Sequence, residues 1–313
     1  MISVKNLSKH YHHFKAVDDL SFDIAPGNIV GFLGPNGAGK STTMKMLTGF
    51  LPPTSGDIVI QDKRYASDAK AIQRNIGYLP EGAPAYGDMT VWQFLHFIAD
   101  VRGLKGAARK ARLFDVIGRV ELADVLNRPI DNLSKGFKRR VGLAQAILHD
   151  PDILILDEPT DGLDPNQKHH VRQLIEDLSK EKIVVISTHI LEEVTAVCNR
   201  VMIIANGQLR FDDTPNALRH QSRFCNAVSL KMSYAADISG LAELEGVEEM
   251  EIDRKTGLVT LFPEPGKHIF HVINEYVTQR RLPVETLTLE QGRLDEVREL
   301  GGFSRWDPMP AGE

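Results

Sequence analysis

The chain has few cysteines and no long hydrophobic run. Its 313 residues include only Cys198 and Cys225, which give neither a disulfide framework nor the spacing of a metal site, so we expect a reducing compartment. No apolar stretch approaches the roughly 20 residues needed to span a bilayer. The N-terminal segment Met1–Lys5 has no signal-peptide hydrophobic region. These absences predict a soluble cytosolic protein.

Strong charge of one sign is also lacking. The formal net charge is −5, which argues against a surface that coats nucleic acid, and we expect no nucleic-acid partner. Internal repeats and low-complexity segments are absent as well. Hydrophobic residues make up 42% of the chain and charged residues 25%, so a buried core is expected. The length predicts one large and one small domain.

One glycine-rich segment fits the phosphate-binding loop pattern G-x-x-x-x-G-K-[ST] at every fixed position. An apolar run precedes it and a helix-like stretch follows, so a strand, a tight turn and a helix N-terminus direct several N–H groups at one anion. Lys40 can reach the β- and γ-phosphates and the Ser41 hydroxyl can bind Mg²⁺. This segment predicts a nucleoside triphosphate site, formed by Gly34, Pro35, Asn36, Gly37, Ala38, Gly39, Lys40, Ser41 and Thr42.

A second chemical signal is a pair of carboxylates after the apolar run Ile153–Leu156. Asp157 is suited to hold Mg²⁺, directly or through water. Glu158 can accept a hydrogen bond from a water that attacks the γ-phosphate. A strand that simply ends in solvated acids would show the same pair, but the phosphate loop and the sequence that follows favour the catalytic interpretation.

The rest of the N-terminal pattern predicts an α/β fold. Ile153–Leu156 and Ile183–Ile186 are short apolar runs with polar ends, as in parallel strands covered on both faces. Phe22–Ile24 indicates an edge strand, and Asn206-Gly207 indicates a hairpin turn between two strands. Apolar residues recur at helical spacing over about residues 86–148, which predicts an inserted helical subdomain.

The first domain is expected to cover residues 1–220 and to be followed by a small α+β domain at 221–300 and a flexible tail at 301–313. The order β-α-β-β-α-β is the ferredoxin-like arrangement. The predicted elements are strand Ala227–Met232, helix Ser239–Leu244, strands Val247–Ile252 and Leu258–Phe262, helix His268–Gln279, strand Val284–Leu289 and helix Leu294–Leu300.

Further segments occur in a specific order with these motifs. Leu133–Phe137 lies upstream of the carboxylates, Pro159–Pro165 follows them, and Ser187–His189 closes a later strand. From Met1 to about Leu218, the chain therefore resembles the nucleotide-binding subunits of ATP-binding cassette (ABC) transporters. The resemblance implies the cassette fold of phosphate-loop nucleotidases, with ATP and Mg²⁺ as cofactors.

The resemblance also implies roles for individual residues. Glu158 resembles the catalytic base, and His189 resembles the switch residue that contacts the γ-phosphate and the water. Tyr11, with Val17 behind it, resembles the aromatic platform that stacks on adenine, although a half-buried tyrosine on an edge strand remains an alternative. A loop at the dimer seam is implied for Asp161, Gly162, Leu163 and Asp164.

The family signature completes the nucleotide site of the opposite subunit. Its consensus is Leu-Ser-Gly-Gly-Gln, so Lys135 and Phe137 are departures. The next residues, Lys138-Arg139-Arg140, form either a solvated helix face or a source of positive potential near the nucleotide. The implied signature residues are Leu133, Ser134, Lys135, Gly136 and Phe137. The implied metal ligands are Ser41, Asp157 and Glu81, the last at a position where the family usually has Gln.

The expected function is therefore an ATPase subunit on the inner face of the cell membrane. It would power export through a separate integral membrane permease, with a second and identical cassette sealing two ATP molecules. Multidrug and gliding-motility exporters are the similar systems. The alternatives are a soluble cassette ATPase of nucleic-acid or translation processes, and a nucleotide-sensing regulator without turnover.

Overall fold

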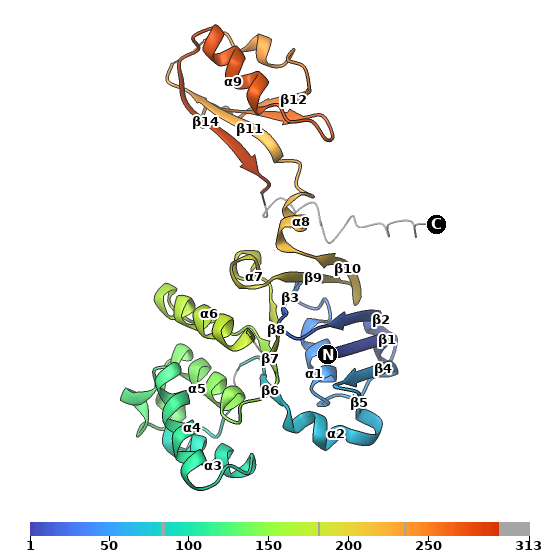
Figure 1. Cartoon of the computed structure of the whole chain (residues 1–313), viewed down its shortest axis with the longest axis vertical. Coiled ribbons are helices and arrows are strands. Elements are labelled where there is room, and N and C mark those ends of the chain that lie inside the picture. Colours follow the sequence, from blue (N-terminus) through green and yellow to red (C-terminus); the bar gives the residue numbers. More distant parts are fainter. Residues whose placement is uncertain (83–84, 181, 235, 294–313) are drawn as a thin grey trace. The chain divides into compact units, whose positions relative to one another are not determined.

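The computed structural model describes residues 1–82, 85–180, 182–234 and 236–293, so the predicted helix Leu294–Leu300 and tail 301–313 lie outside them. The chain forms two compact units, Met1–Pro215 and a second one that begins at Asn216 (Figure 1). The boundary predicted near His220 lies slightly later in the chain. Within the described ranges, no helix is both long and apolar enough to cross a bilayer.

The first unit is built around a six-stranded sheet of order β10-β9-β3-β8-β7-β6. All neighbouring strands are parallel except the β9–β10 pair, which is antiparallel. Asn206 and Gly207 join that pair with positive φ angles of 53° and 77°, as the predicted hairpin turn requires. The strands are β3 (Ile29–Leu33), β6 (Ile76–Leu79), β7 (Ile153–Asp157), β8 (Ile183–Thr188), β9 (Arg200–Ala205) and β10 (Gln208–Asp213).

Every residue of β3, β7 and β8 is buried, which explains why their sequences are apolar runs without alternation. Parallel strands end at a common edge of the sheet, and ligands bind at that edge in open α/β folds. The phosphate loop follows β3, Glu81 follows β6, Glu158 follows β7, and His189 follows β8. The topology therefore gathers the predicted site residues at one edge.

A second sheet of order β2-β1-β4-β5 packs with the central sheet around helix α1 (Lys40–Leu47). Phe22 of β2 contacts Phe32 of β3 edge-to-face, with ring centroids 5.4 Å apart. The strand predicted at Phe22–Ile24 is much longer and begins at Phe14. The strands are β1 (Ile2–Tyr11), β2 (Phe14–Ile24), β4 (Ser55–Ile60) and β5 (Lys63–Arg64), and helix α2 (Tyr65–Arg74) follows.

The predicted helical subdomain contains three helices. The first begins with a capping box, in which the Thr90 hydroxyl accepts a hydrogen bond from the Gln93 N–H and the Gln93 side chain accepts one from the Thr90 N–H. Figure 1 shows the three helices gathered on one side of the first unit. They are α3 (Val91–Val101), α4 (Gly106–Arg119) and α5 (Lys135–Ile147). Helices α6 (Pro165–Ser179) and α7 (Leu191–Val197) contact strands of the central sheet: α6 contacts β8, and α7 contacts β3 and β8.

The second unit is a four-stranded antiparallel sheet of order β12-β13-β11-β14. This order, with a short 3₁₀ turn η3 (Ser239–Leu241) and helix α9 in the crossovers, is the ferredoxin-like arrangement predicted from the sequence. Ile273 of α9 is fully buried against the sheet. Helix α8 (Pro215–Arg219) spans the boundary between the units. The later elements are β11 (Cys225–Met232), β12 (Val247–Ile252), β13 (Leu258–Pro263), α9 (Phe270–Gln279) and β14 (Val284–Gln291).

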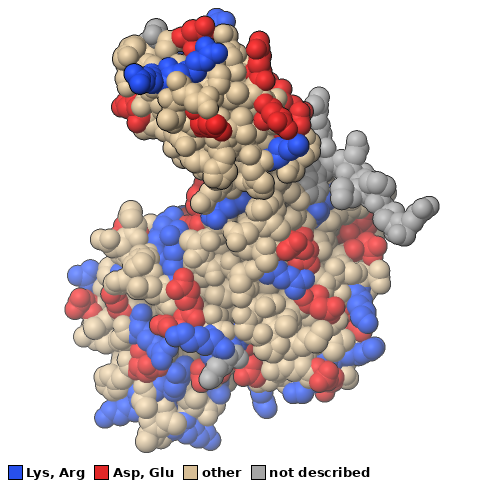
Figure 2. Space-filling view, turned by 45° about the horizontal axis from the view of Figure 1, so that its top comes forward, with Lys and Arg blue, Asp and Glu red and all other residues tan. Residues whose placement is uncertain are grey.

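Charged side chains of both signs are interspersed on the surface. Figure 2 shows Lys and Arg mixed with Asp and Glu over the face that it draws. This mixture accords with the small net charge of −5. It gives that face no broad region of a single sign.

Candidate active site

Two glycines allow the phosphate loop to fold tightly against neighbouring backbone. A Cβ added at Gly34 would lie 2.3 Å from the Ile204 carbonyl oxygen. At Gly39, φ is +107° and a Cβ would lie 2.5 Å from the Ala16 carbonyl oxygen. Glycine is required at both positions because any side chain would displace backbone. Helix α1 begins directly afterwards at Lys40, so the free N–H groups of its first turn face the loop.

Lys40 is buried in this loop, with 7% of its surface exposed. Its ammonium group donates hydrogen bonds to the carbonyl oxygens of Gly34 (2.6 Å) and Pro35 (3.0 Å). Burial lowers the pKa of Lys40, while the negative charges of Glu158, Asp157 and Glu81 act in the opposite direction. Lys40 is therefore a cation in an acidic environment, held close to where a phosphate would meet the loop.

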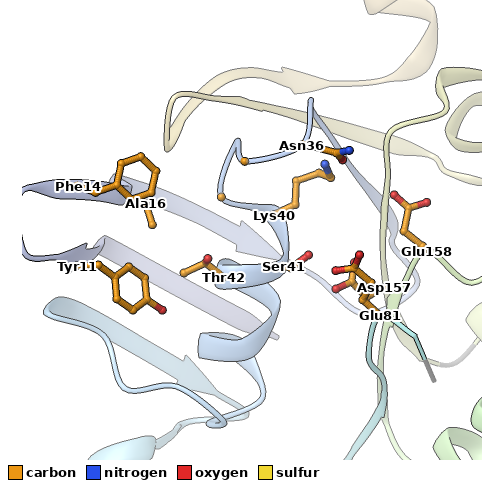
Figure 3. Close-up of a pocket in the computed structure, with 12 residues that line it drawn as sticks. Tyr11, Phe14, Ala16, Asn36, Lys40, Ser41, Thr42, Glu81, Asp157 and Glu158 are labelled. Carbon is orange, nitrogen blue, oxygen red and sulfur yellow. The ribbon is translucent and has the colours of Figure 1, made fainter. Parts of the chain in front are cut away.

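A cleft of about 310 Å³ opens beside the loop. Figure 3 shows the Tyr11 and Phe14 rings at one end and the carboxylates of Glu81, Asp157 and Glu158 at the other, with Lys40 and Ser41 between them. The cleft thus has an aromatic end, a phosphate-binding middle and an acidic end. Its lining residues are Tyr11, Phe14, Ala16, Asn36, Gly37, Gly39, Lys40, Ser41, Thr42, Glu81, Asp157 and Glu158.

The aromatic end comes from the β1–β2 hairpin, where Tyr11 pairs with Phe14. Tyr11 and Phe14 are 46% and 61% exposed, so ring surface is available for stacking on a planar base. Val17 is fully buried behind the loop, with its side chain near Gly39. Sequence reasoning missed Phe14. The signal was available in principle, because residues that flank a tight hairpin turn lie opposite each other.

Asp157, at the end of β7, has the character of a metal ligand. It is 1% exposed, and one carboxylate oxygen accepts a hydrogen bond from the Ser187 hydroxyl. The other oxygen is buried and has no hydrogen-bond partner among the described residues. A buried carboxylate oxygen left unpaired is costly, and a cation would satisfy it.

The donor set around Asp157 fits Mg²⁺. Ser41 and Glu81 line the same cleft, so a hydroxyl and two carboxylates face it. Within the described ranges, no group of three or more His, Cys, Asp or Glu side chains forms a complete metal cage. Mg²⁺ is usually held by one or two carboxylates and completed by water and substrate phosphates, so this sparse set matches its preference.

Glu158 is held by two side chains from the end of β8. The His189 Nδ1 lies 2.8 Å from one carboxylate oxygen, and the Thr188 hydroxyl lies 3.2 Å from the other. The Glu158 backbone has φ +52°, an uncommon conformation for a non-glycine residue. Its carboxylate is thereby fixed at the acidic end of the cleft, as a positioned general base requires.

Arg139 organises the backbone beneath these carboxylates, and sequence reasoning missed this role. It is 4% exposed and donates hydrogen bonds to the carbonyl oxygens of Pro80 (3.0 Å), Asp157 (2.6 Å) and Glu158 (2.8 Å). Burial lowers the pKa of Arg139. Arg140 is buried as well. The solvated-face interpretation is therefore wrong for these two residues, and the helical spacing of Arg139 with the buried Leu143 could have signalled it.

The signature lies at the N-terminus of α5. The Ser134 hydroxyl accepts a hydrogen bond of 3.4 Å from the Phe137 N–H and caps the helix. Phe137 stacks against the Arg140 guanidinium, 4.2 Å from its ring centroid. Among the described residues that line the cleft, none belongs to the signature. The structure therefore does not bring the signature to the cleft of its own chain.

The predicted seam loop contacts the signature. The Lys135 ammonium group lies 2.8 Å from the Asp161 carboxylate, which lowers the pKa of Asp161. Gly162 has φ +75°, and a Cβ there would lie 2.7 Å from the Lys135 stem. Asp164 accepts a hydrogen bond from the Gln167 N–H and caps α6. Lys135, which departs from the consensus, thus has two partners in the seam loop: Asp161 for its charge and Gly162 for its stem.

Comparisons with known proteins agree with this geometry. The family model described as ABC transporter matches residues 17–161. The bacitracin transport ATP-binding protein BcrA of Bacillus licheniformis is 32% identical over 306 residues, which is 96% of this chain and 98% of that protein. The Nod factor export ATP-binding protein I of Burkholderia orbicola (strain AU 1054) is 33% identical over 77% of this chain and 79% of its own length.

A solved structure shares the fold of the first unit. The ATP-binding subunit of an ABC transporter superposes with a TM-score of 0.66 at 32% sequence identity, and the match covers 71% of this chain and 92% of that chain. The predicted fold class, a phosphate-loop cassette with a helical subdomain, is confirmed. The roles of single site residues stay predictions.

Proposed function

The chain belongs to the ABC transporter family of ATP-binding proteins, and from this premise we propose that its ATPase activity powers export through a separate membrane permease. The observation that carries the catalytic part is the arrangement around Glu158. A carboxylate held by His189 and Thr188 lies across the cleft from Lys40 and the phosphate loop. This arrangement suits the hydrolysis of a bound triphosphate.

Each end of the cleft has a distinct task in this proposal. Tyr11 and Phe14 stack on the adenine ring, and the loop amides and Lys40 hold the phosphates. Glu158 accepts a proton from the attacking water while His189 keeps the carboxylate in place. Mg²⁺ would be held by Ser41, Asp157 and Glu81, and it would neutralise charge on the β- and γ-phosphates.

A second copy of the chain completes the site. The signature lies outside the cleft of its own chain among the described lining residues, and its Ser134 and Gly136 are the consensus positions that the family resemblance assigns to the partner's γ-phosphate. Ser134 and Lys135, at the N-terminus of α5, are exposed, and a helix N-terminus favours an anion. Two identical chains arranged head-to-tail would therefore bind two ATP molecules between them, and hydrolysis would release the pair.

Replacement of Glu158 tests the catalytic proposal. Glu158→Gln removes the basic carboxylate but keeps its shape, so we expect turnover to fall by about 10²–10⁴-fold while MgATP affinity is retained. Steady-state phosphate release and equilibrium nucleotide binding measure the two quantities. Glu192→Gln, on the exposed side of α7, is the control. Full turnover in the Glu158→Gln chain would remove Glu158 from the reaction.

The membrane part of the proposal has its own test. The names of the relatives refer to bacitracin transport and Nod factor export, which favours an exporter over a soluble ATPase that acts on nucleic acid or in translation. We infer a location on the inner face of the membrane, where ATP is available. Affinity purification from detergent-solubilised membranes should recover a protein with several membrane spans. Recovery of ribosomal or DNA-bound proteins instead would favour the soluble alternative.

A further inference from the structure

Glu193 is a buried carboxylate that lies just outside the cleft. It is in the first turn of α7 and is 9% exposed. One carboxylate oxygen accepts a hydrogen bond of 2.5 Å from the Thr160 hydroxyl, and the other accepts one of 2.8 Å from the Lys168 ammonium group. The neighbouring Glu192 is exposed. The two adjacent acids of this helix therefore differ sharply in environment.

The Thr188 hydroxyl connects Glu193 with Glu158. It lies 3.3 Å from a Glu193 carboxylate oxygen and 3.2 Å from a Glu158 carboxylate oxygen. Its oxygen also accepts a hydrogen bond of 3.1 Å from the Ile190 N–H. A hydroxyl has a single proton to donate, so Thr188 serves one carboxylate at a time. Glu193 is thus separated from Glu158 by one hydroxyl group.

The contacts of Glu193 come from three segments that are distant in sequence. Thr160 directly precedes the seam loop of Asp161 to Asp164, Lys168 lies in α6, and Thr188 directly precedes His189. A buried ion pair is weak support for stability, because desolvation offsets the attraction between its charges. A buried carboxylate held by Thr160 and Lys168, and within reach of the shared Thr188 hydroxyl, is better explained by the geometry that it imposes.

We propose that Glu193 is a positioning residue for ATP hydrolysis, which holds Thr160 and Thr188 together and so couples the seam loop to Glu158 and His189. The inference rests on the proposed role of Glu158. When the second copy displaces the seam loop, the displacement reaches Thr188 through the Glu193 carboxylate. Glu193 itself touches neither nucleotide nor water, since it does not line the cleft among the described residues.

Glu193→Gln in the full-length chain tests this, with Glu192→Gln as the matched control on the same helix. A misplaced base is less effective although the nucleotide site is intact, so kcat should fall between about 10-fold and 100-fold. KM and MgATP affinity should stay within about twofold, because no contact with the phosphates or with the adenine ring is lost. The control should retain the activity of the original chain. Loss of nucleotide affinity in parallel with kcat would indicate general disruption and would overturn the proposal.

The double variant with Glu158→Gln distinguishes positioning from an independent effect. If Glu193 acts through Glu158, adding Glu193→Gln to Glu158→Gln should leave single-turnover hydrolysis unchanged. Multiplication of the two losses would contradict the proposal. Thr188→Val breaks the same link by removing only a hydroxyl, and it should reproduce the loss of kcat even where Glu193→Gln fails to fold. Normal kcat in a folded Thr188→Val chain would also overturn the proposal.

Failure of this inference can be told apart from failure of the proposed function. Full turnover in the Glu158→Gln chain would contradict the base assignment, and with it this inference. Lost turnover in Glu158→Gln together with normal kcat in Glu193→Gln would contradict only the positioning role. Phosphate release from MgATP is the measurement in both cases.

Discussion

Lys40 shows how the surroundings of one residue prepare a binding site. Its ammonium group donates hydrogen bonds to two backbone carbonyl oxygens, at 2.6 and 3.0 Å. Three carboxylates in the cleft favour the charged form of Lys40 and so oppose the lowering of its pKa by burial. Phosphate oxygens are stronger acceptors for an ammonium group than neutral carbonyls. A bound triphosphate would therefore take over these hydrogen bonds.

Lys40→Ala should weaken MgATP binding through the loss of this charged contact. A hydrogen bond to a charged group contributes about 1.5–3 kcal/mol, so affinity should fall by roughly one to two orders of magnitude. Fluorescent nucleotide titration measures the change. Lys45→Ala, at an exposed position of the same helix, is the control. Equal affinities for the Lys40→Ala chain and the original chain would show that the loop does not hold the phosphates.

Single residues could be predicted where they belong to a sequence motif. They were missed where their role depends on contacts with distant segments. The sequence predicted that the phosphate loop, Asp157 and Glu158 form one site because each follows an apolar strand pattern, and the structure places them around one cleft; their roles stay predictions. Arg139 was missed because its acceptors include Pro80, which is 59 residues away. Its helical spacing with Leu143 could have indicated burial, but no local pattern reports a contact with so distant a residue.

At the scale of elements, the signature and the seam loop form one unit. Lys135 and Asp161 are 70% and 49% exposed, so their ion pair adds little to the stability of a single chain. The Lys135 stem nevertheless lies over Gly162, whose φ of +75° favours glycine. This contact fixes the start of α5 relative to the loop at the proposed seam.

Lys135→Met should therefore affect association more than stability. The apolar stem is kept and the charge is lost, so the melting temperature should change by no more than about 2–4 °C, in line with an exposed pair. ATP-driven dimerisation should weaken severalfold, with nucleotide affinity of the single chain unchanged. Lys138→Met, at a partly exposed position of the same helix whose ammonium group lies near Asp131 rather than the seam loop, should have no such effect. If the Lys135→Met chain dimerises as well as the original chain, the Lys135–Asp161 ion pair has no role in dimerisation.

Elements were predicted well where periodicity is uninterrupted. The buried strands near Ile153 and Ile183 and the Asn206-Gly207 hairpin agree with the structure. Strand β2 was predicted too short because Asp18 and Asp19 interrupt its alternation. Asp19 has φ +57°, and the pairing of β1 with β2 shifts register nearby. Such irregularities in a strand conceal its full length from a pattern search.

At the scale of the whole molecule, two units have separate hydrophobic cores. The second core contains seven fully or almost fully buried residues from the sheet, η3, and the start and body of α9. The sequence predicted the order of its described strands and helices. The ferredoxin-like arrangement predicted from that order implies the sheet order β12-β13-β11-β14, which the structure shows. The predicted helix Ser239–Leu244 is only a short 3₁₀ turn, Ser239–Leu241.

The association of two whole chains is the central claim, because the proposed function requires the partner's signature to complete each cleft. Sedimentation of the Glu158→Gln chain, which should bind ATP without consuming it, tests this most directly. The account predicts a monomer without nucleotide and a dimer with saturating MgATP. A chain that binds MgATP and yet remains monomeric, or one that dimerises equally without nucleotide, would contradict it.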